Sequence, residues 1–474
     1  MFAAVSRSSV AAVIADALAR ADVSRVFAAA GAERALIDAA RNRGLAVVET
    51  AGATAACIMA AVTAELGDAP GVALVSLGAG LAPIVDGAAH ASRDRAGIVV
   101  ISDGGSDARL LEPVLKASVS VEPAAAAHWI AHAAQAAMAH PRGAVHLALG
   151  AGVAGAPALP VATTVRRAAA AAPASEALDA VADAIARASR PVLVVGLEVA
   201  ADDAKWVRAL AESLPAPVLT TPKGKGALPD PHPLALGLLA ADHALLAQSD
   251  LLISLGVDSV ELTPRAWPAG VAIVRIARAP QDDAIVADIA LVLEELAPRL
   301  RGRMRADWDV AALDRLKRAH TASAPRPGLA RRRVVEIARE ATPAGTILAL
   351  DVPLADAWAS VAPRECLVPN GAATLGFALP AAVAAALARE ASRVIAIGAA
   401  AGFETMAGEW ATAARLGVAI VAVALNQAGS SDVATAARAA GVQTLSAGDE
   451  AGLRVAFERA WRSKATALID AHVR

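Results

Sequence analysis

The chain has 474 residues, of which 56% are hydrophobic and only 3% aromatic. A chain of this length exceeds what one hydrophobic core supports, so two or three domains are expected. The 44 Lys and Arg residues against 46 Asp and Glu give a net charge of -2, which argues against nucleic acid as a partner. Cys57 and Cys366 lie outside any CxxC pattern, which is typical of buried, reduced thiols in a cytoplasmic protein.

Two apolar stretches could be mistaken for membrane or export signals. Ser8–Val23 has helical periodicity that Asp16 and Arg20 interrupt, which predicts an ordinary helix instead of a signal peptide. Residues 371–388 carry no charge, but they contain Pro380 and consist mostly of alanine and glycine. This composition predicts a buried helix entered through a loop, and no membrane association is expected.

The first segment, up to about Gly155, alternates short apolar strands with alanine-rich helices. The predicted strands lie in VSRVFAAAG, LAVVET, GVALVSLG, AGIVVISD and GAVHLALG. This alternation predicts a parallel sheet covered by helices on both faces. Pro160–Ser175 lacks a consistent apolar period and is interpreted as a linker, so the first domain is predicted over residues 1–159.

Two further α/β units follow. The central unit, predicted over residues 176–298, contains strands in RPVLVVG, PAPVLTT and SDLLISLGVD, and Gly196 opens no GxGxxG fingerprint. The third unit, predicted over residues 327–474, contains strands in TILALD, VIAIG and IVAVALN, and its closing segment TALIDAHV is predicted to be an edge strand. The predicted fold class is therefore α/β, with three doubly wound parallel-sheet domains.

The order of these segments resembles the thiamine-diphosphate-dependent enzymes of the acetolactate synthase and 2-oxo-acid decarboxylase type. The resemblance is carried by PGVALVSLGAGLAPIVDG, by PAPVLTTPKGKGALPDPHPLALG and by VIAIGAAAGFETMAGEW with VAIVAVALNQAG. It implies pyrimidine-binding-like, central and diphosphate-binding-like domains, with thiamine diphosphate and magnesium as cofactors and FAD as a possible ligand of the central domain. It also implies a 2-oxo acid substrate, decarboxylase or carboligase chemistry, and a homodimer or homotetramer.

The resemblance also assigns the site residues. The glycines of a GPG turn fall on Gly78 and Gly80, and a bulky apolar residue that bends the cofactor falls on Leu375, with Ala373 beside it. The metal-binding GDG-to-NN motif falls on Ala399–Ala401 and Asn426–Gln427, in a register set by Glu409 and Trp410. The implied metal ligands are Ala400, Gln427 and Gly429.

Two of these positions lack the implied chemistry. Magnesium requires oxygen ligands, whereas Ala400 offers no side-chain oxygen and the Gln427 amide is one methylene longer than asparagine. A family glutamate that protonates the cofactor falls on Gly52 or Ala53, and the nearest carboxylate is Glu49. Glu49 is the candidate catalytic residue, although a position near the N–H groups at the following helix start is at least as consistent with the sequence.

Several other polar residues have two interpretations. His90 is either a proton carrier or a packing residue, and His128 and His132, at i and i+4, are either metal ligands or part of an exposed helix face. Packing and exposure are favoured because no third ligand accompanies the pair. Lys223 and Lys225 are predicted to be solvated.

Three functional hypotheses follow from these observations. The chain is an active enzyme with unusual replacements, a catalytically silent paralogue that acts as a structural or regulatory partner, or an enzyme that uses the same cleft for different chemistry. The replacements at Ala400 and at Gly52 or Ala53 predict that thiamine diphosphate binds weakly or not at all.

Overall fold

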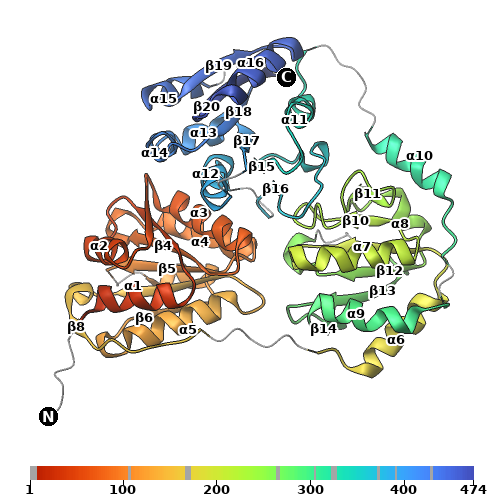
Figure 1. Cartoon of the computed structure of the whole chain (residues 1–474), viewed down its shortest axis with the longest axis horizontal. Coiled ribbons are helices and arrows are strands. Elements are labelled where there is room, and N and C mark those ends of the chain that lie inside the picture. The colour runs from red at the N-terminus through yellow and green to blue at the C-terminus, as the bar shows by residue number, and fades with distance from the viewer. Residues whose placement is uncertain are drawn as a thin grey trace. The chain divides into compact units, whose positions relative to one another are not determined.

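The computed structural model describes residues 8–104, 108–165, 172–262, 267–303, 306–321, 328–370, 374–389, 392–427 and 431–474. The chain divides into two compact units. The first contains Met1–Ala168, Ala372–Ala447 and Val455–His472, and the second contains Ala169–Gly371, Gly448–Arg454 and Val473–Arg474. The described strands form three six-stranded parallel sheets and one two-stranded pair (Figure 1). The predicted α/β fold with three parallel sheets is confirmed, while the predicted domain boundaries stay a prediction.

The first sheet has the strand order β3-β2-β4-β5-β7-β6. Its strands are β2 (Arg25–Ala29), β3 (Ala46–Thr50), β4 (Gly71–Ser76), β5 (Ile98–Asp103), β6 (Ala117–Ser120) and β7 (Ala144–Leu149). One face packs against α1 (Val10–Arg20), α2 (Arg34–Asn42) and α5 (Ala126–Met138). Helices α3 (Ala53–Leu66) and α4 (Ala82–Arg93) pack together, and α3 also contacts β2 and β4.

Local chemistry explains where these elements begin and how closely they pack. The Ser9 hydroxyl accepts a hydrogen bond from the Ala12 N–H at 3.2 Å, which caps α1 and confirms the predicted N-terminal helix. A Cβ at Gly71 would lie 2.0 Å from the Ala60 carbonyl oxygen. The close approach of β4 to α3 therefore requires glycine at this position. A short strand pair, β1 (Ser8–Ser9) with β8 (Pro157–Ala158), is antiparallel.

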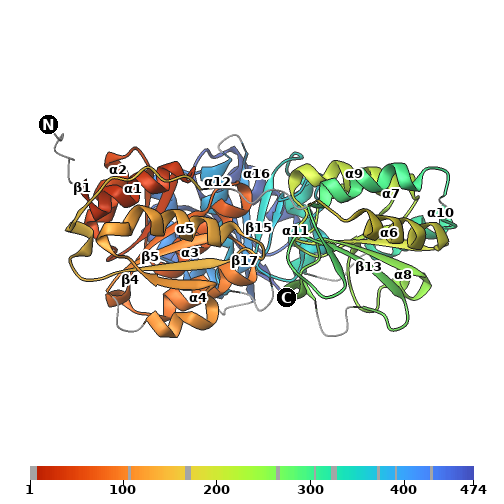
Figure 2. The same cartoon turned by 90° about the horizontal axis from the view of Figure 1, so that it is seen from below.

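The second sheet has the order β11-β10-β9-β12-β13-β14. Its strands are β9 (Pro191–Val195), β10 (Val218–Thr220), β11 (Ala235–Leu238), β12 (Leu251–Leu255), β13 (Ala272–Ala277) and β14 (Ala284–Val286). One face packs against α6 (Ser175–Arg187), α7 (Ala204–Ser213) and α9 (Ile289–Leu300), and the other against α8 (Ala244–Gln248) and α10 (Val310–Thr321). Figure 2 shows α7 and α9 on the side of this sheet opposite α8.

The third sheet has the order β16-β15-β17-β18-β20-β19. Its strands are β15 (Ile347–Leu350), β16 (Cys366–Leu367), β17 (Val394–Ala399), β18 (Ile420–Gln427), β19 (Gln443–Ala447) and β20 (Ala467–Val473). The prediction that the closing strand lies at the edge was wrong, because β20 lies between β18 and β19. Most residues of β20 are buried, as expected of an internal strand, whereas β19 is mostly half-buried.

The helices of the third segment are α11 (Arg331–Glu340), α12 (Ala378–Ala388), α13 (Ala400–Thr405), α14 (Glu409–Leu416), α15 (Val433–Ala439) and α16 (Glu450–Arg462). The buried helix predicted within residues 371–388 is confirmed as α12. Pro380 lies in its first turn, where a missing N–H costs no intrahelical hydrogen bond. Within the described ranges, the model contains no helix of the length and apolar character that a membrane crossing requires.

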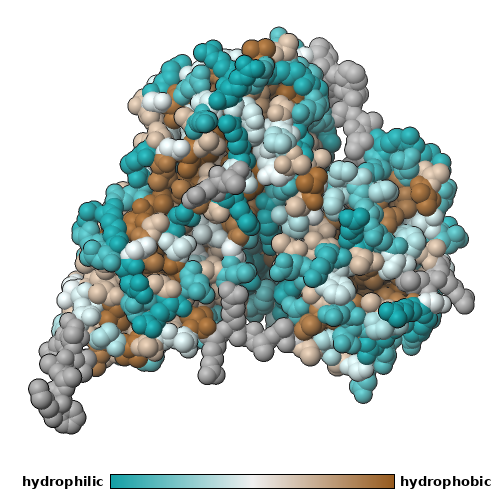
Figure 3. Space-filling view, in the orientation of Figure 1, coloured by the Kyte–Doolittle hydropathy of each residue, from teal (hydrophilic) through white to brown (hydrophobic). Residues whose placement is uncertain are grey.

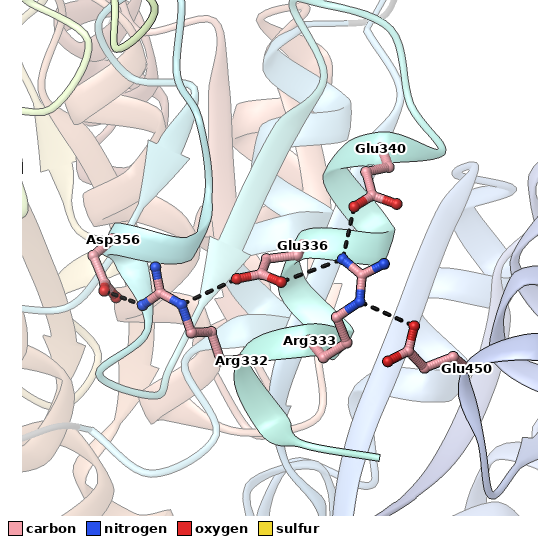
Figure 4. A network of polar contacts seen from close by, with 6 residues as sticks. All are labelled: Arg332, Arg333, Glu336, Glu340, Asp356 and Glu450. Carbon is pink, nitrogen blue, oxygen red and sulfur yellow. Dashed lines mark hydrogen bonds and ion pairs between the residues drawn. The ribbon is translucent and has the colours of Figure 1, made fainter. Parts of the chain in front are cut away.

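A network of ion pairs joins α11 to the start of α16 in the second unit (Figure 4). Arg333 bonds Glu340 at 2.7 Å and Glu450 at 3.0 Å, and Arg332 bonds Glu336 at 3.0 Å. The hydrogen bond that Arg333 donates to Glu340 holds the pKa of Arg333 well above its ordinary value. These contacts explain why Gly448–Arg454 belongs to the second unit although most of α16 does not.

The surface is mixed in character. In the view of Figure 3, hydrophobic residues form separate patches interspersed with hydrophilic residues. Large hydrophobic side chains that are exposed within the described residues are Leu110, Leu159, Val286, Val310, Leu375 and Val455.

Two predictions, on the cysteines and on two lysines, can be compared with the structure. Cys57 and Cys366 are buried, as predicted, and burial raises the pKa of Cys57 to about 12. The prediction that Lys223 and Lys225 are solvated was wrong, because both are buried. Lys225 donates to the Asp230 carboxylate at 2.5 Å, and this carboxylate also accepts the Ser360 N–H. An enclosed ion pair of this kind has no signature in the local sequence.

Candidate functional site

The candidate metal-binding positions lie at the carboxyl ends of two neighbouring parallel strands. Ala399, the last residue of β17, pairs with Leu425 on β18, so Ala400 and Asn426 follow at the same edge. Ala400 is the first residue of α13 and is 4% exposed. This confined position is occupied by a methyl group that coordinates nothing.

The neighbouring amides have different surroundings. Asn426 is buried, and its Nδ2 donates to the Ser431 carbonyl and to the Asp470 carboxylate, both at 3.0 Å. Gln427 is exposed. Gly429 and Ala373 lie outside the described residues. The Asn426 side chain therefore links Ser431 to Asp470 on β20.

The predicted turn glycines lie at the carboxyl end of β4. Gly80 has a φ of +117°, a conformation that favours glycine. A Cβ at Gly78 would lie 3.5 Å from the Ser76 hydroxyl, which is an ordinary contact, so the backbone demands glycine only at Gly80. Leu375 is 51% exposed, in agreement with a side chain that projects from its loop.

Glu49 lies on β3 and points toward α2. Its carboxylate binds the Arg41 guanidinium, which lowers the pKa of Glu49. The Glu49 side chain is 47% exposed and its backbone carbonyl accepts a hydrogen bond from Arg415. The structure thus makes Glu49 an ionised, ion-paired group, and its assignment as a proton donor stays a prediction.

A different carboxylate lies beside the position where the family glutamate was placed. Glu409, at the start of α14, is 1% exposed, and its Oε1 accepts the Ala51 N–H at 2.9 Å. Burial raises the pKa of Glu409, while contacts with Thr412 and with the N–H groups of Ala51 and Gly52 partly offset this. Because α3 has no side-chain cap of its own, Glu409 stabilises the turn that leads into it.

His90 is placed as a packing residue, whereas His128 and His132 are exposed on α5. His90 is buried, its Nδ1 lies 3.2 Å from the Thr374 hydroxyl, and its ring lies 5.2 Å from that of Phe377. Among the described residues, no group of three or more His, Cys, Asp or Glu is placed to hold a metal ion. The metal-ligand interpretation of His128 and His132 therefore has no structural support.

Comparison with known families identifies the fold. Three models match: the thiamine pyrophosphate enzyme N-terminal TPP binding domain over residues 8–118, the central domain over residues 178–296, and the C-terminal TPP binding domain over residues 351–431. The chain belongs to the thiamine pyrophosphate enzyme family. The recognition from sequence is thereby confirmed.

Curated relatives carry related names. The chain is 32% identical over 231 residues to acetolactate synthase isozyme 1 large subunit of Escherichia coli, a match that covers 44% of this chain and 41% of that protein. It is 32% identical over 235 residues to a probable 2-ketoarginine decarboxylase, AruI, of Pseudomonas aeruginosa, covering 45% of this chain and 42% of the relative. The match to the catabolic acetolactate synthase of Raoultella terrigena is 27% identical over 443 residues. It covers 83% of this chain and 78% of that protein. The chain thus matches about two fifths of the length of the first two relatives.

The metal site implied by the thiamine pyrophosphate enzyme family does not fit the described residues. Ala400 has no side-chain oxygen, while the Asn426 amide nitrogen bonds the Ser431 carbonyl and the Asp470 carboxylate. Magnesium prefers several oxygen ligands in octahedral arrangement. Among the described residues of this edge, Ala400 therefore offers no side-chain ligand at the position to which the resemblance assigns the metal-binding carboxylate.

Glu409 is the residue whose role the sequence did not predict. It served only to set the register of the family motif, because an acidic residue at the start of a helix is ordinarily solvated. Its partner Ala51 is 358 residues away in the chain. The one signal in the sequence is the large aromatic residue Trp410 directly after Glu409, which is fully buried in the structure.

We expect Glu409→Ala to lower the free energy of unfolding of the first unit by about 2 kcal/mol, because it removes the buried carboxylate that accepts the Ala51 N–H. Urea unfolding followed by circular dichroism at pH 7 measures this loss. The matched control is Glu409→Gln, which retains an amide oxygen for Ala51 and should lose clearly less. Equal losses in the two variants would contradict the capping role.

Proposed function

We propose that this chain is an acetolactate-synthase-like member of the thiamine pyrophosphate enzyme family, with C–C bond cleavage or ligation on 2-oxo acids as its reaction class. We further propose that it binds thiamine diphosphate and Mg²⁺ only weakly. The names of the relatives support the reaction class. The enclosed Ala400 methyl group at the metal-binding edge supports the weak binding.

The physical reason is the loss of a charged ligand. A diphosphate needs a hard cation or several N–H donors to offset its negative charge. Without the carboxylate at Ala400, a bound Mg²⁺ would keep only neutral oxygens from this edge. The cation is then held loosely and neutralises the diphosphate poorly.

A second candidate function is a catalytically silent partner of an active relative. The observation that favours it is the ion pair between Glu49 and Arg41, which leaves the family glutamate without a replacement from β3. A positioned acid–base group typically contributes roughly 10²–10⁴-fold in rate. A chain that lacks both this group and the metal-binding carboxylate would keep the fold without catalysing the reaction, and it could then act only through contacts with a partner.

Calorimetric titration of thiamine diphosphate with Mg²⁺ tests the proposal. We expect little or no heat with the unmodified protein and at least roughly tenfold tighter binding by Ala400→Asp. The matched control is Ala401→Asp, which adds the same charge one residue further on at an exposed position. It should leave binding unchanged.

Two results would contradict the proposal. Micromolar binding by the unmodified protein would show that the edge retains a working cofactor site, and a screen of 2-oxo acids would then be the next step. Equal gains from Ala400→Asp and Ala401→Asp would show that added charge, and not a metal ligand at position 400, is responsible. Thermal unfolding of each variant controls for damage to the fold.

We also propose a cytoplasmic homodimer or homotetramer. Support for the compartment comes from Cys57 and Cys366, which are buried and not joined in a disulfide, since reduced thiols are typical of the cytoplasm. Support for self-association comes from the family, whose sites form between two chains.

A further inference from the structure

The central sheet has a crevice position of the type that binds ligands in other open α/β sheets. From β9 the chain moves outward to β10 and β11, and then returns to place β12 on the other side of β9. The strand order thus reverses between β9 and β12. Ligands of such sheets bind outside the carboxyl ends of the strands at this switch point.

A carboxylate of the chain itself occupies this position. Glu261, in the short 3₁₀ turn Ser259–Glu261 after β12, accepts the Leu197 N–H at 3.0 Å and the Asp258 N–H at 3.2 Å on one oxygen. Its other oxygen bonds the hydroxyl of Thr221, which is fully buried. Glu261 therefore joins the loops that follow β9, β10 and β12.

These contacts exceed what a local turn requires. The bond to Asp258 alone belongs to a capping box of the 3₁₀ turn. Leu197 and Thr221, however, lie 64 and 40 residues away in the chain. A Cβ at Gly196 would lie 2.4 Å from the Val257 Cα and 2.6 Å from a Glu261 oxygen, so glycine is needed where the backbone after β12 and the carboxylate both approach β9.

A second carboxylate takes the next pair of N–H groups along the same edge. Glu198 is 6% exposed and accepts the N–H groups of Arg278 at 2.6 Å and Ala279 at 3.1 Å, just after β13. The Arg278 guanidinium in turn bonds Asp203 at 2.8 Å. Four backbone N–H groups at this edge, those of Leu197, Asp258, Arg278 and Ala279, are thus bound to Glu261 or Glu198.

We propose that Glu261 is a built-in carboxyl ligand of the central domain, and that it fills the switch-point position at which a nucleotide diphosphate would bind. FAD, which the family resemblance allowed in this domain, does not fit the site. Its diphosphate would find the Leu197 and Asp258 N–H groups occupied and would face the carboxyl groups of Glu261, Glu198 and Asp258. Each of these groups that is ionised repels the negative charge of the diphosphate.

The groups around Glu261 determine how it titrates. Asp258 lies on its own loop and Glu198 on the loop after β9, and both are acidic. Positive charge comes from Arg278 after β13, from the buried Lys223 two residues after Thr221, and from Arg364, which bonds the Leu197 carbonyl at 3.3 Å. Burial is the main reason that the pKa of Glu261 is raised to about 7, against an ordinary value of 4.5.

The first test is binding of FAD and of ADP to the full chain, by flavin fluorescence and by calorimetry. We expect no saturable binding of either by the unmodified protein. Saturable binding of FAD or ADP would overturn the proposal. No cofactor needs to be loaded for this measurement, so it stands independently of the thiamine diphosphate titration.

The second test is the pH dependence of thermal unfolding of the second unit. Because the folded pKa lies above the unfolded one, the carboxyl stabilises fully below about pH 4.5, and this contribution is lost as the pH rises through about 7. The midpoint should fall by on the order of 5 °C between pH 5 and pH 8. Glu261→Gln, which has the shape of the neutral acid, should largely remove this fall.

An unchanged pH dependence of thermal unfolding in Glu261→Gln would overturn the proposal. Should that variant fail to fold, Thr221→Val provides a second measurement. It keeps the carboxyl but removes a hydroxyl that favours the charged form, so the pH at which stability is lost should move upward. No movement in this variant would also overturn the proposal.

Discussion

Replacing Trp410 with alanine should lower the free energy of unfolding of the first unit by about 3–5 kcal/mol, the usual cost of removing a fully buried tryptophan. Trp410 is 0% exposed and stacks on Phe403 with ring centroids 5.5 Å apart and an interplanar angle of 17°. The pair holds α13 against α14, between the candidate metal position at Ala400 and the Glu409 cap. Denaturant unfolding of the full chain measures the loss.

The control for this prediction is Trp410→Phe. Among the described residues no acceptor bonds the buried Trp410 indole N–H, so phenylalanine keeps an aromatic partner for Phe403 and removes an unsatisfied donor. Its cost should be well below that of alanine. If both variants lose the same free energy, the aromatic stack is not what stabilises this region.

Acidification should destabilise the first unit through His146. This residue is fully buried on β7, with Nε2 at 2.8 Å from the Ser102 hydroxyl and Nδ1 at 2.9 Å from the Ser118 hydroxyl. Burial lowers the pKa of His146 from 6.5 to about 4. The neutral ring is therefore required in the folded state, while the unfolded chain takes up a proton below about pH 6.5.

The sign and size follow from this difference in proton binding. The contribution of His146 to the free energy of unfolding is fully present above about pH 6.5, the unfolded pKa. It is lost as the pH falls from about 6.5 to about 4, by roughly 3 kcal/mol in total. Urea unfolding at pH 7.5 and pH 4.5 measures the loss. His146→Gln, which can bond both serines but does not titrate there, should lose roughly 3 kcal/mol less between the two pH values. An equal acid loss in the variant would exclude His146 as its source.

Several strands that the sequence predicted have residues that are almost all buried. β4, β5 and β7 read as continuous apolar runs because both faces of a parallel strand are covered. Two of the strands that were not assigned, β6 and β19, are half-exposed and rich in serine, threonine or glutamine. Their pairing with a neighbour, and not their own composition, makes them strands.

The candidate site divides in the same way. Glycine at Gly80 and the positions of Ala400 and Asn426 followed from a motif with fixed spacing, and the structure places Ala400 and Asn426 at one strand edge. The roles of Glu409 and Glu261 could not be predicted from a motif, because each carboxylate accepts N–H groups that lie far away in the chain. Sequence patterns report local periodicity, whereas the burial of a carboxylate depends on tertiary partners that only the folded chain reveals.

The place of β20 has a consequence for local opening. β19 comes earlier in the chain than β20 but hydrogen-bonds to the rest of its sheet only through it. Any fluctuation that frees β20 must free β19 as well, while β19 can detach alone. The amides of Gln443–Ala447 should therefore exchange with solvent deuterium at least as fast as those of Ala467–Val473, and the two strands should form one cooperative unit whose outer half frays first.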